Sequence, residues 1–327
     1  MNKKKHIIEK NILDFPLQIK SGLERNFDSI SFNRKVKNIL VCGMGGSALA
    51  AEFLKRFYPI RIHRNYELPI RLVDKNTLVV CISYSGNTEE IVSAYNIAIE
   101  KNLPVVVLSS GGILKTRSLK ESVPFIEILT KNIEPRMSVM EQICILKKLF
   151  DSLKIKPHGE KSLVIKSIIV PENFAPQAKI IAKNLVDKVP LVYASIENKA
   201  SAIFWKALLN ENAKVPAFWN VFPEINHNEL MHGQGITWLK KFHILSLVDD
   251  DDHIKIQNRM RLSIDILKRK GFGANIIKIE GLTPFEKIIN SIIVGNWISY
   301  FLAEELKIDP SDPDVREEFK RLISQSN

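Results

Sequence analysis

Apolar positions in the first half of the chain fall into short runs that alternate with helical repeats. The short runs are rich in β-branched residues and predict buried strands at 38–42, 60–63, 78–83 and 105–108. Helical spacing predicts helices near 47–57, 88–101 and 136–153, after an earlier helix at 6–26 with a kink at Pro16. Strands that alternate with helices in this way indicate a parallel sheet covered on both faces.

A second series of the same kind follows a polar Lys-Pro stretch at 152–158, which we interpret as a linker. Its predicted strands are 191–194, 217–219, 243–248 and 275–278, its predicted helices are 173–188, 199–212, 254–270 and 284–306, and a tail carries Pro310 and Pro313. The pattern predicts an α/β protein of two domains, 1–153 and 154–327, each a mostly parallel sheet flanked by helices.

Composition fits this prediction and excludes several other classes. The chain has 327 residues, of which 45% are hydrophobic and 25% charged, as in ordinary soluble globular proteins. The charged residues Glu9 and Lys10 interrupt any signal-peptide core near the N-terminus. The longest apolar stretch, 292–303, contains Asn296 and Ser299 and is too short for a membrane span. We expect neither export nor a membrane partner.

The cysteines indicate the cellular compartment, and the net charge limits the classes of binding partner. Cys42, Cys81 and Cys144 lack the paired spacing of a zinc site or a disulfide framework, so we expect them to be buried, unpaired and in a reducing cytoplasm. The net charge of +11 permits nucleic acid, an acidic membrane surface or an anionic small molecule as a partner. The basic residues are scattered and no nucleic-acid motif accompanies them, so a solvated basic face is the better interpretation.

The first motif is a strand that runs through glycines into a helix, from Val41 through Gly43, Gly45 and Gly46 to Ser47. Glycines allow a backbone to approach a ligand closely, and the N-terminus of a helix attracts anions. The pattern also satisfies the G-x-G-x-x-A form of a dinucleotide-binding Rossmann domain. A Rossmann domain needs an acid near the end of the second strand, where only Glu67 is available, so a dehydrogenase stays an alternative.

The second motif favours a phosphate ligand of another kind. Ser83, Ser85 and Thr88 surround Gly86 between a buried strand and a helix that opens with two glutamates. The three hydroxyls and the main-chain amides of the helix N-terminus form a cradle of neutral donors for one phosphate. Helix capping is the competing interpretation, although capping accounts for one hydroxyl and not three.

With these two turns the sequence resembles the sugar isomerase (SIS) family, whose signature is a strand followed by Ser-x-Ser-Gly-x-Thr-Glu. More narrowly it resembles the bifunctional phosphoglucose/phosphomannose isomerases, over both halves of the chain. The matching residues outside the turns are Glu134-Pro135-Arg136, Leu209-Asn210-Glu211-Asn212-Ala213-Lys214 and Pro223-Glu224-Ile225-Asn226-His227-Asn228-Glu229. The resemblance implies two SIS-like domains, a phosphate site at Gly46, Ser47, Ser83, Ser85 and Thr88, and no cofactor.

The resemblance also implies a reaction. Isomerisation of an aldose to a ketose moves a proton between C1 and C2 through an enediolate, which requires a carboxylate base, a donor for the oxyanion and a group that opens the sugar ring. Arg136 is the candidate for the cation. By resemblance Glu211 is the proton shuttle and His227 is associated with ring opening. From residue type alone, Glu211 is more typical of a solvated acid at a helix end. Arg136 is also typical of an ion-pair partner for Glu134 or of a cap on the neighbouring helix.

Two further residues have open roles. Lys320, near the C-terminus, is a plausible counterpart of a substrate-facing lysine in the family, or a solvated lysine of a terminal helix. His227, Glu229 and His232 suggest a metal site, but the five-residue spacing of the histidines is not that of two ligands on one helix face, and a third nitrogen or sulfur ligand is missing. We therefore expect no metal.

The sequence thus predicts an isomerase that interconverts glucose 6-phosphate, and mannose 6-phosphate as a second aldose, with fructose 6-phosphate. The expected partner is a small sugar phosphate, and the resemblance implies a homodimer in which His227 enters the site of the second copy. Two alternatives remain: an NAD(P)-dependent Rossmann oxidoreductase, and a non-catalytic SIS module that senses a sugar phosphate and has no need of Glu211 or His227.

Overall fold

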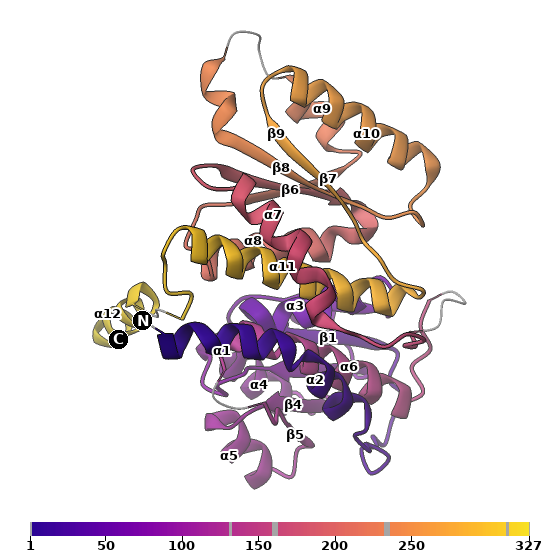
Figure 1. The fold of residues 1–327 in the computed structure, drawn as a ribbon. Helices are drawn as coiled ribbons and strands as arrows, with labels where there is room; N and C mark the ends of the chain where they lie inside the picture. The colour runs from indigo at the N-terminus through magenta and orange to yellow at the C-terminus, as the bar shows by residue number, and fades with distance from the viewer. Residues whose placement is uncertain (1, 131–132, 159–162, 232–235, 312–313, 327) are drawn as a thin grey trace.

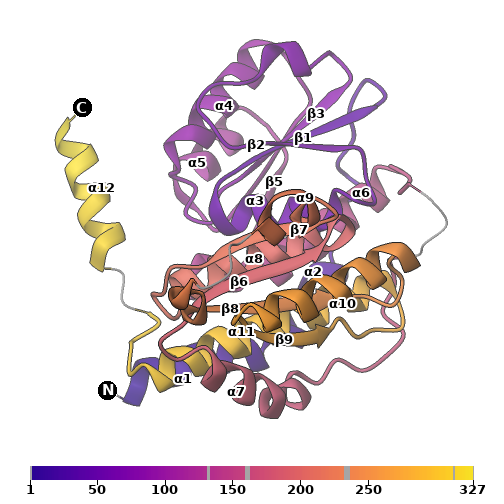
Figure 2. The same ribbon diagram turned by 90° about the horizontal axis from the view of Figure 1, so that it is seen from above.

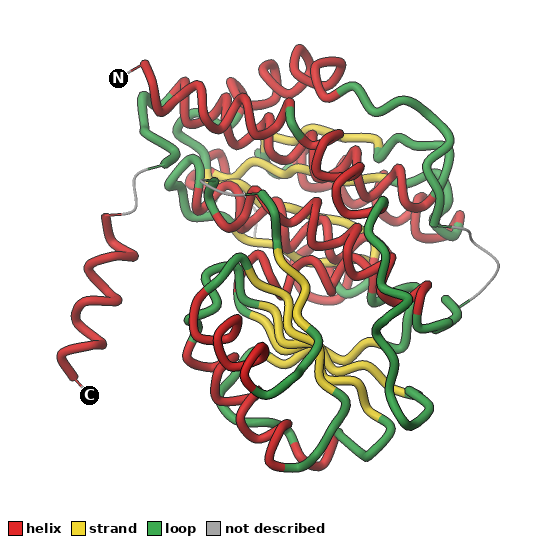
Figure 3. Tube along the Cα trace, turned by 90° about the horizontal axis from the view of Figure 1, so that it is seen from below, coloured by secondary structure: helices red, strands yellow, loops and turns green. Residues whose placement is uncertain are grey.

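The computed structural model describes residues 2–130, 133–158, 163–231, 236–311 and 314–326. Two parallel sheets are stacked with helices between them and outside them (Figure 1). Figure 3 shows the strands of the two sheets as separate groups among the helices. The predicted α/β class and the parallel sheets are confirmed.

The first sheet contains five parallel strands in the order β2-β1-β3-β4-β5. These strands are β1 (Asn38–Gly43), β2 (Ile60–His63), β3 (Thr77–Ile82), β4 (Val105–Ser109) and β5 (Phe125–Glu127). Alternate residues of each strand face opposite sides, and both sides are buried. One side packs against α4 (Glu89–Glu100) and α5 (Gly112–Lys120), the other against α3 (Gly45–Leu54) and α6 (Val139–Ser152).

The strand order of this sheet argues against the Rossmann alternative. In the usual dinucleotide-binding order the third strand lies outside the second, giving 3-2-1-4-5-6. Here β3 lies beside β1, with Cys42 level with Cys81 and Gly43 level with Ile82. The chain therefore adds β2 on one side of β1 and then crosses to the other side of β1 to add β3, β4 and β5. Ligands of such sheets bind outside the carboxyl ends of the strands at this position.

The second sheet contains four parallel strands in the order β7-β6-β8-β9. They are β6 (Val189–Ser195), β7 (Phe218–Phe222), β8 (Phe242–Val248) and β9 (Gly273–Lys278). Its inner face packs against α7 (Ala175–Asn184), α8 (Lys199–Glu211) and α11 (Pro284–Glu305), and its outer face against α9 (Ile225–Asn228) and α10 (Ile254–Arg269).

One apolar core joins the inner faces of the two sheets. α8 packs against α3, and α11 packs against α1 (Asn2–Leu13), while α2 (Phe15–Leu23) packs against α6. The buried residues of all these helices belong to a single cluster that also contains Val41 and Val80 of the first sheet and Val192 and Leu245 of the second. The N-terminal helices therefore tie the two halves together.

Most predicted elements are confirmed, with a few corrections. The helix expected at 6–26 is two helices, α1 and α2, divided just before Pro16. The helix expected from 136 begins at Val139, after a 3-10 turn at Pro135–Ser138. The proline-containing tail carries a further helix, α12 (Asp314–Ser326), which stands apart from the body in Figures 1 and 2. The domain division at residues 153 and 154 lies in the coil after α6 and stays a prediction.

Cys42, Cys81 and Cys144 are unpaired and buried, as expected. The apolar stretch 292–303 lies inside α11, which is packed against α7 and α8. Within the described ranges, every helix is too short or too polar to cross a membrane.

Candidate active site

The hydroxyl-rich turn after β3 has the geometry of an anion cradle. Ser83 is buried, and its Oγ lies 2.7 Å from Oγ1 of Thr88 and accepts a hydrogen bond from the Gly86 amide at 3.1 Å. Thr88 occupies the N-cap position of α4, yet its side chain makes no capping hydrogen bond. The capping interpretation is therefore wrong for Thr88, whose hydroxyl turns toward Ser83. Ser85 is exposed and accepts a bond from the Asn87 amide at 3.3 Å.

Gly86 is needed because the turn passes very close to a neighbouring loop. Its φ of +71° lies in the left-handed region, and a Cβ at this position would overlap the carbonyl oxygen of Gly111. Tyr84, between the two serines, donates its hydroxyl to the Thr130 carbonyl at 3.0 Å, and burial raises the pKa of that hydroxyl. The close approach to Gly111 and the hydrogen bond to Thr130 thus fix the turn at the carboxyl edge of the first sheet.

The glycine turn after β1 meets Arg136. α3 begins at Gly45, and a Cβ at Gly46 would lie 3.3 Å from Cα of Arg136 and 3.5 Å from the Pro135 carbonyl oxygen. Ser47, in the first turn of α3, is 7% exposed. A Cβ here would press on the backbone of the 3-10 turn, so a glycine suits the close approach of Arg136 to the start of α3. Because β1 and β3 are adjacent, both turns open at one edge of the sheet.

Arg136 and Glu211 form an ion pair across the two halves of the chain. The Arg136 side chain is 5% exposed, and its Nη1 lies 3.4 Å from Oε2 of Glu211 and 3.0 Å from Oε2 of Glu134. Glu211 is the last residue of α8, and its side chain is 38% exposed, so a small molecule has access to the carboxylate. The structure therefore brings Gly46, Arg136 and Glu211 together.

The buried guanidinium has further partners that sequence reasoning missed. Its Nε donates to Oδ1 of Asn212 at 2.6 Å, and its Nη2 donates to the Pro310 carbonyl at 2.7 Å. Pro310 lies between α11 and α12, so the segment that leads to the C-terminal helix is attached at the candidate site. Pro310 lies 174 residues after Arg136, and no sequence motif predicts a contact between them.

His227 lies on a different part of the molecule from Glu211. It is an exposed residue of α9, which follows the carboxyl end of β7 and covers the outer face of the second sheet beside α10 (Figure 1). α8 covers the inner face, and Glu211 ends it on the side where β7 begins. The second sheet therefore separates the two side chains within one chain.

Two other predicted residues fall outside what the structure describes. The backbone of Lys320 belongs to α12, but its side chain lies outside the described part of the chain. His232 also lies outside the described residues. In the part of the chain that the structure describes, no cluster of three histidine, cysteine, aspartate or glutamate residues could hold a metal ion.

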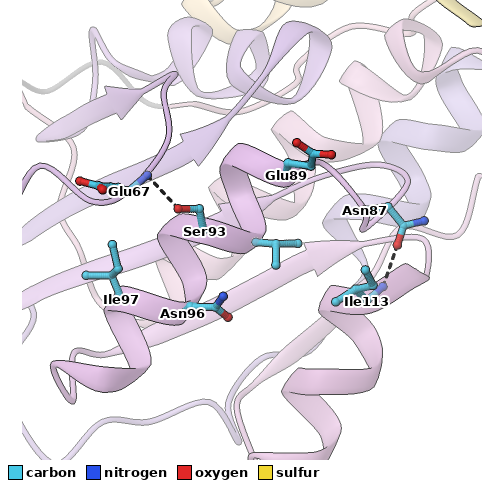
Figure 4. A pocket seen from close by; sticks show the side chains of 8 residues that line it. Glu67, Asn87, Glu89, Ser93, Asn96, Ile97 and Ile113 are labelled. Atoms are coloured by element: carbon cyan, nitrogen blue, oxygen red, sulfur yellow. Dashed lines mark hydrogen bonds between the residues drawn. The ribbon is translucent and has the colours of Figure 1, made fainter. Parts of the chain in front are cut away.

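A separate surface hollow of about 430 Å³ lies along the outer side of α4 (Figure 4). Glu67 borders it with its backbone amide bonded to the Ser93 hydroxyl at 3.0 Å, and Asn87 accepts a bond from the Ile113 amide at 2.9 Å. Glu67 and Glu89 both line this hollow, which makes it unfavourable for a phosphate. Glu67 thus lines this hollow together with Asn87 and Glu89, the two neighbours of Thr88.

Comparison with known proteins agrees with this geometry. The SIS domain family matches residues 34–118, and the bacterial phospho-glucose isomerase C-terminal SIS domain family matches residues 174–323. The bifunctional phosphoglucose/phosphomannose isomerase of Caldicellulosiruptor bescii is 32% identical over 325 residues, which cover 92% of this chain and 94% of the relative. The enzyme of that name from Aquifex aeolicus is 30% identical over 296 residues, covering 88% and 91%. This chain belongs to the bifunctional phosphoglucose/phosphomannose isomerase family.

A solved structure supports the fold of this family member over its whole length. A hypothetical protein from Thermus thermophilus has a TM-score of 0.71 at 12% identity, over 100% of this chain and 91% of that chain. The resemblance carried by the two turns is confirmed. Membership of a family of isomerases contradicts both the oxidoreductase alternative and the non-catalytic sensor.

Proposed function

We propose that this chain interconverts glucose 6-phosphate and mannose 6-phosphate with fructose 6-phosphate through an enediolate, without a cofactor. The observation that carries the proposal is the pairing of Glu211 with the buried Arg136, directly beside the glycine turn that begins α3. A carboxylate and a cation next to a phosphate cradle are the groups that this reaction requires.

The phosphate is assigned to the cradle. The amides at the starts of α3 and α4 and the hydroxyls of Ser47, Ser83, Ser85 and Thr88 provide neutral donors, and Gly46 lets Arg136 lie close to the start of α3. Both helix N-termini add positive potential at the same edge of the sheet. The sugar then extends toward Glu211 at the end of α8.

The chemical step is a proton transfer at adjacent carbons. Glu211 removes the proton from C2 of the open-chain aldose, and the C2–H electron pair forms the C1=C2 bond while the carbonyl pair moves onto O1. Arg136 stabilises the negative O1. Glu211 returns its proton to C1, the O2 proton passes to O1, and C2 becomes the ketone. Glucose and mannose 6-phosphates differ only at C2 and share this intermediate, so one base serves both aldoses.

Ring opening is assigned to His227 of a second copy. An imidazole can accept a proton at one ring nitrogen and donate one from the other, which suits it to proton transfer at the ring oxygen and the anomeric hydroxyl. Because the second sheet separates His227 from Glu211 within one chain, we assign a homodimer in which each copy supplies this histidine to the other. Lys320 is proposed as a further substrate contact, and the three buried unpaired cysteines support a cytoplasmic location.

A coupled assay of the purified protein with each aldose phosphate, in the presence of EDTA, tests the proposal. Glu211→Gln should lower kcat by at least ~10² with little change in KM, and should lose the exchange of solvent deuterium into C2 of the aldose. Glu134→Gln is the matched control, since Glu134 contacts the same Nη1 of Arg136. If Glu134→Gln is inactive and Glu211→Gln is active, Glu134 and not Glu211 is the base. An inactive wild type with both aldoses would refute the function.

A further inference from the structure

Asn212 occupies an unusual position between the candidate site and the core. It follows Glu211 directly at the end of α8, and it is completely buried. Its Oδ1 accepts the hydrogen bond from Nε of Arg136 at 2.6 Å, and its Nδ2 donates to Oγ of Ser299 at 2.9 Å. One amide side chain therefore joins the guanidinium to α11.

The far end of this bridge is also fixed. Ser299 is completely buried, and its hydroxyl donates to the Asn296 carbonyl at 3.0 Å. The serine oxygen is therefore the acceptor for Asn212, which leaves Oδ1 of Asn212 to face Arg136. The backbone amide of Asn212 bonds to the Leu208 carbonyl at 2.7 Å, so the end of α8 moves together with the side chain.

The charge balance around Arg136 explains the choice of a neutral acceptor. Two carboxylates, those of Glu134 and Glu211, already share Nη1, while Nε and Nη2 donate to neutral oxygens of the Asn212 amide and the Pro310 carbonyl. An aspartate at 212 would add a further negative charge beside one buried cation that Glu134 and Glu211 already contact. That charge would compete with Glu211 for the guanidinium and favour protonation of the base.

We propose that Asn212 is a positioning residue, which holds Arg136 against Glu211 through a neutral hydrogen bond and couples both to α11 through Ser299. The inference rests on the proposed isomerase function. It assigns to Asn212 no contact with the substrate. Its effect comes from the orientation of the guanidinium and from the absence of charge at its Nε.

Asn212→Asp is the decisive variant, because it keeps the shape of the side chain and the acceptor for Nε of Arg136 and adds the charge. It also loses the donor to Ser299, a loss that Ser299→Ala reproduces without the charge. We expect its kcat for fructose 6-phosphate to fall by roughly tenfold or more, with KM changed little, since misplaced groups act mainly on the transition state. We also expect the acid limb of the kcat–pH profile to move to higher pH by about one unit. Asn212→Ser, which is too short to reach Arg136, should lower kcat without that shift.

Ser299→Ala is the matched control. It breaks the same bridge at the other end, leaves Nε of Arg136 paired, and adds no charge, so the thermal midpoint should fall while the acid limb stays in place. An active wild type with an unshifted Asn212→Asp profile and normal kcat would overturn the inference while leaving the isomerase function intact. Equal shifts in Asn212→Asp and Ser299→Ala would also overturn it, since the bridge would then be only structural. If Asn212→Asp fails to fold, normal kcat in Asn212→Ser overturns it.

Discussion

Thr88→Val is the sharpest test of the phosphate cradle, because it removes one hydroxyl and keeps the shape of the side chain. The Thr88 hydroxyl lies 2.7 Å from Oγ of Ser83 and does not cap α4. The substitution therefore does not remove a helix cap. Ser83 keeps the hydrogen bond from the Gly86 amide at 3.1 Å, so the turn retains its shape.

The size of the effect follows from the charge on the ligand. A hydrogen bond to a charged group contributes about 1.5–3 kcal/mol, whereas a neutral pair such as Thr88 with Ser83 contributes about 1 kcal/mol. Loss of the Thr88 donor should therefore weaken phosphate binding by roughly 10- to 150-fold. The loss of folding stability should be much smaller, about 1 kcal/mol.

The assay compares the KM for fructose 6-phosphate and the inhibition constant of inorganic phosphate in wild type and Thr88→Val. Both constants should rise together, with kcat little changed, because the phosphate is bound equally in the ground and transition states. Thr116→Val is the control, since Thr116 is an exposed residue of α5 whose hydroxyl bonds only weakly to the Gly112 carbonyl at 3.4 Å. If folded Thr88→Val has the same KM and the same inhibition constant as wild type, the Thr88 hydroxyl does not bind the phosphate.

Three other perturbations have defined outcomes. Mixing inactive Glu211→Gln and His227→Ala chains should restore about a quarter of wild-type activity if each site takes its histidine from the second copy, and none if it does not. Gly86→Ala should raise KM and lower the thermal midpoint, because a Cβ there meets the Gly111 carbonyl and φ is +71°. Burial raises the pKa of Asp252 to about 6, so the favourable contribution of its protonation is lost as pH rises from about 4 through 6. Asp252→Asn should therefore raise the thermal midpoint at pH 7.5 and leave it unchanged at pH 3.5.

The parts of the fold that the sequence predicted well are those with strong local patterns. β1 and β3 are short and contain the apolar runs 39–42 and 78–82, and glycine or serine comes directly after each run, so their positions and the turns after them were predictable. α5 and β5 were missed. Within α5 only Leu114 and Ser118 are buried, which leaves a weak helical pattern, and β5 has three residues at the sheet edge.

The candidate site was predicted by residue type and resemblance, but its assembly was not predictable. Arg136, Asn212 and Pro310 come from three distant segments, and their contact depends on how α8 packs against α3 and α11. The periodicity of apolar residues predicts single helices and strands, and it does not predict a contact between distant segments. The roles of Glu211, Arg136, His227 and Lys320 stay predictions until the variants are measured.

The shared core between the two sheets has a consequence for how this protein can move. Its central helices bury their apolar residues against both halves at once, so the halves cannot separate about a hinge without exposing that core to water. The chain should melt as one cooperative unit, with a single calorimetric transition, and a half expressed alone should expose a large apolar face. Substrate entry and product release should then proceed without separation of the two halves, since the apolar core between them stays closed.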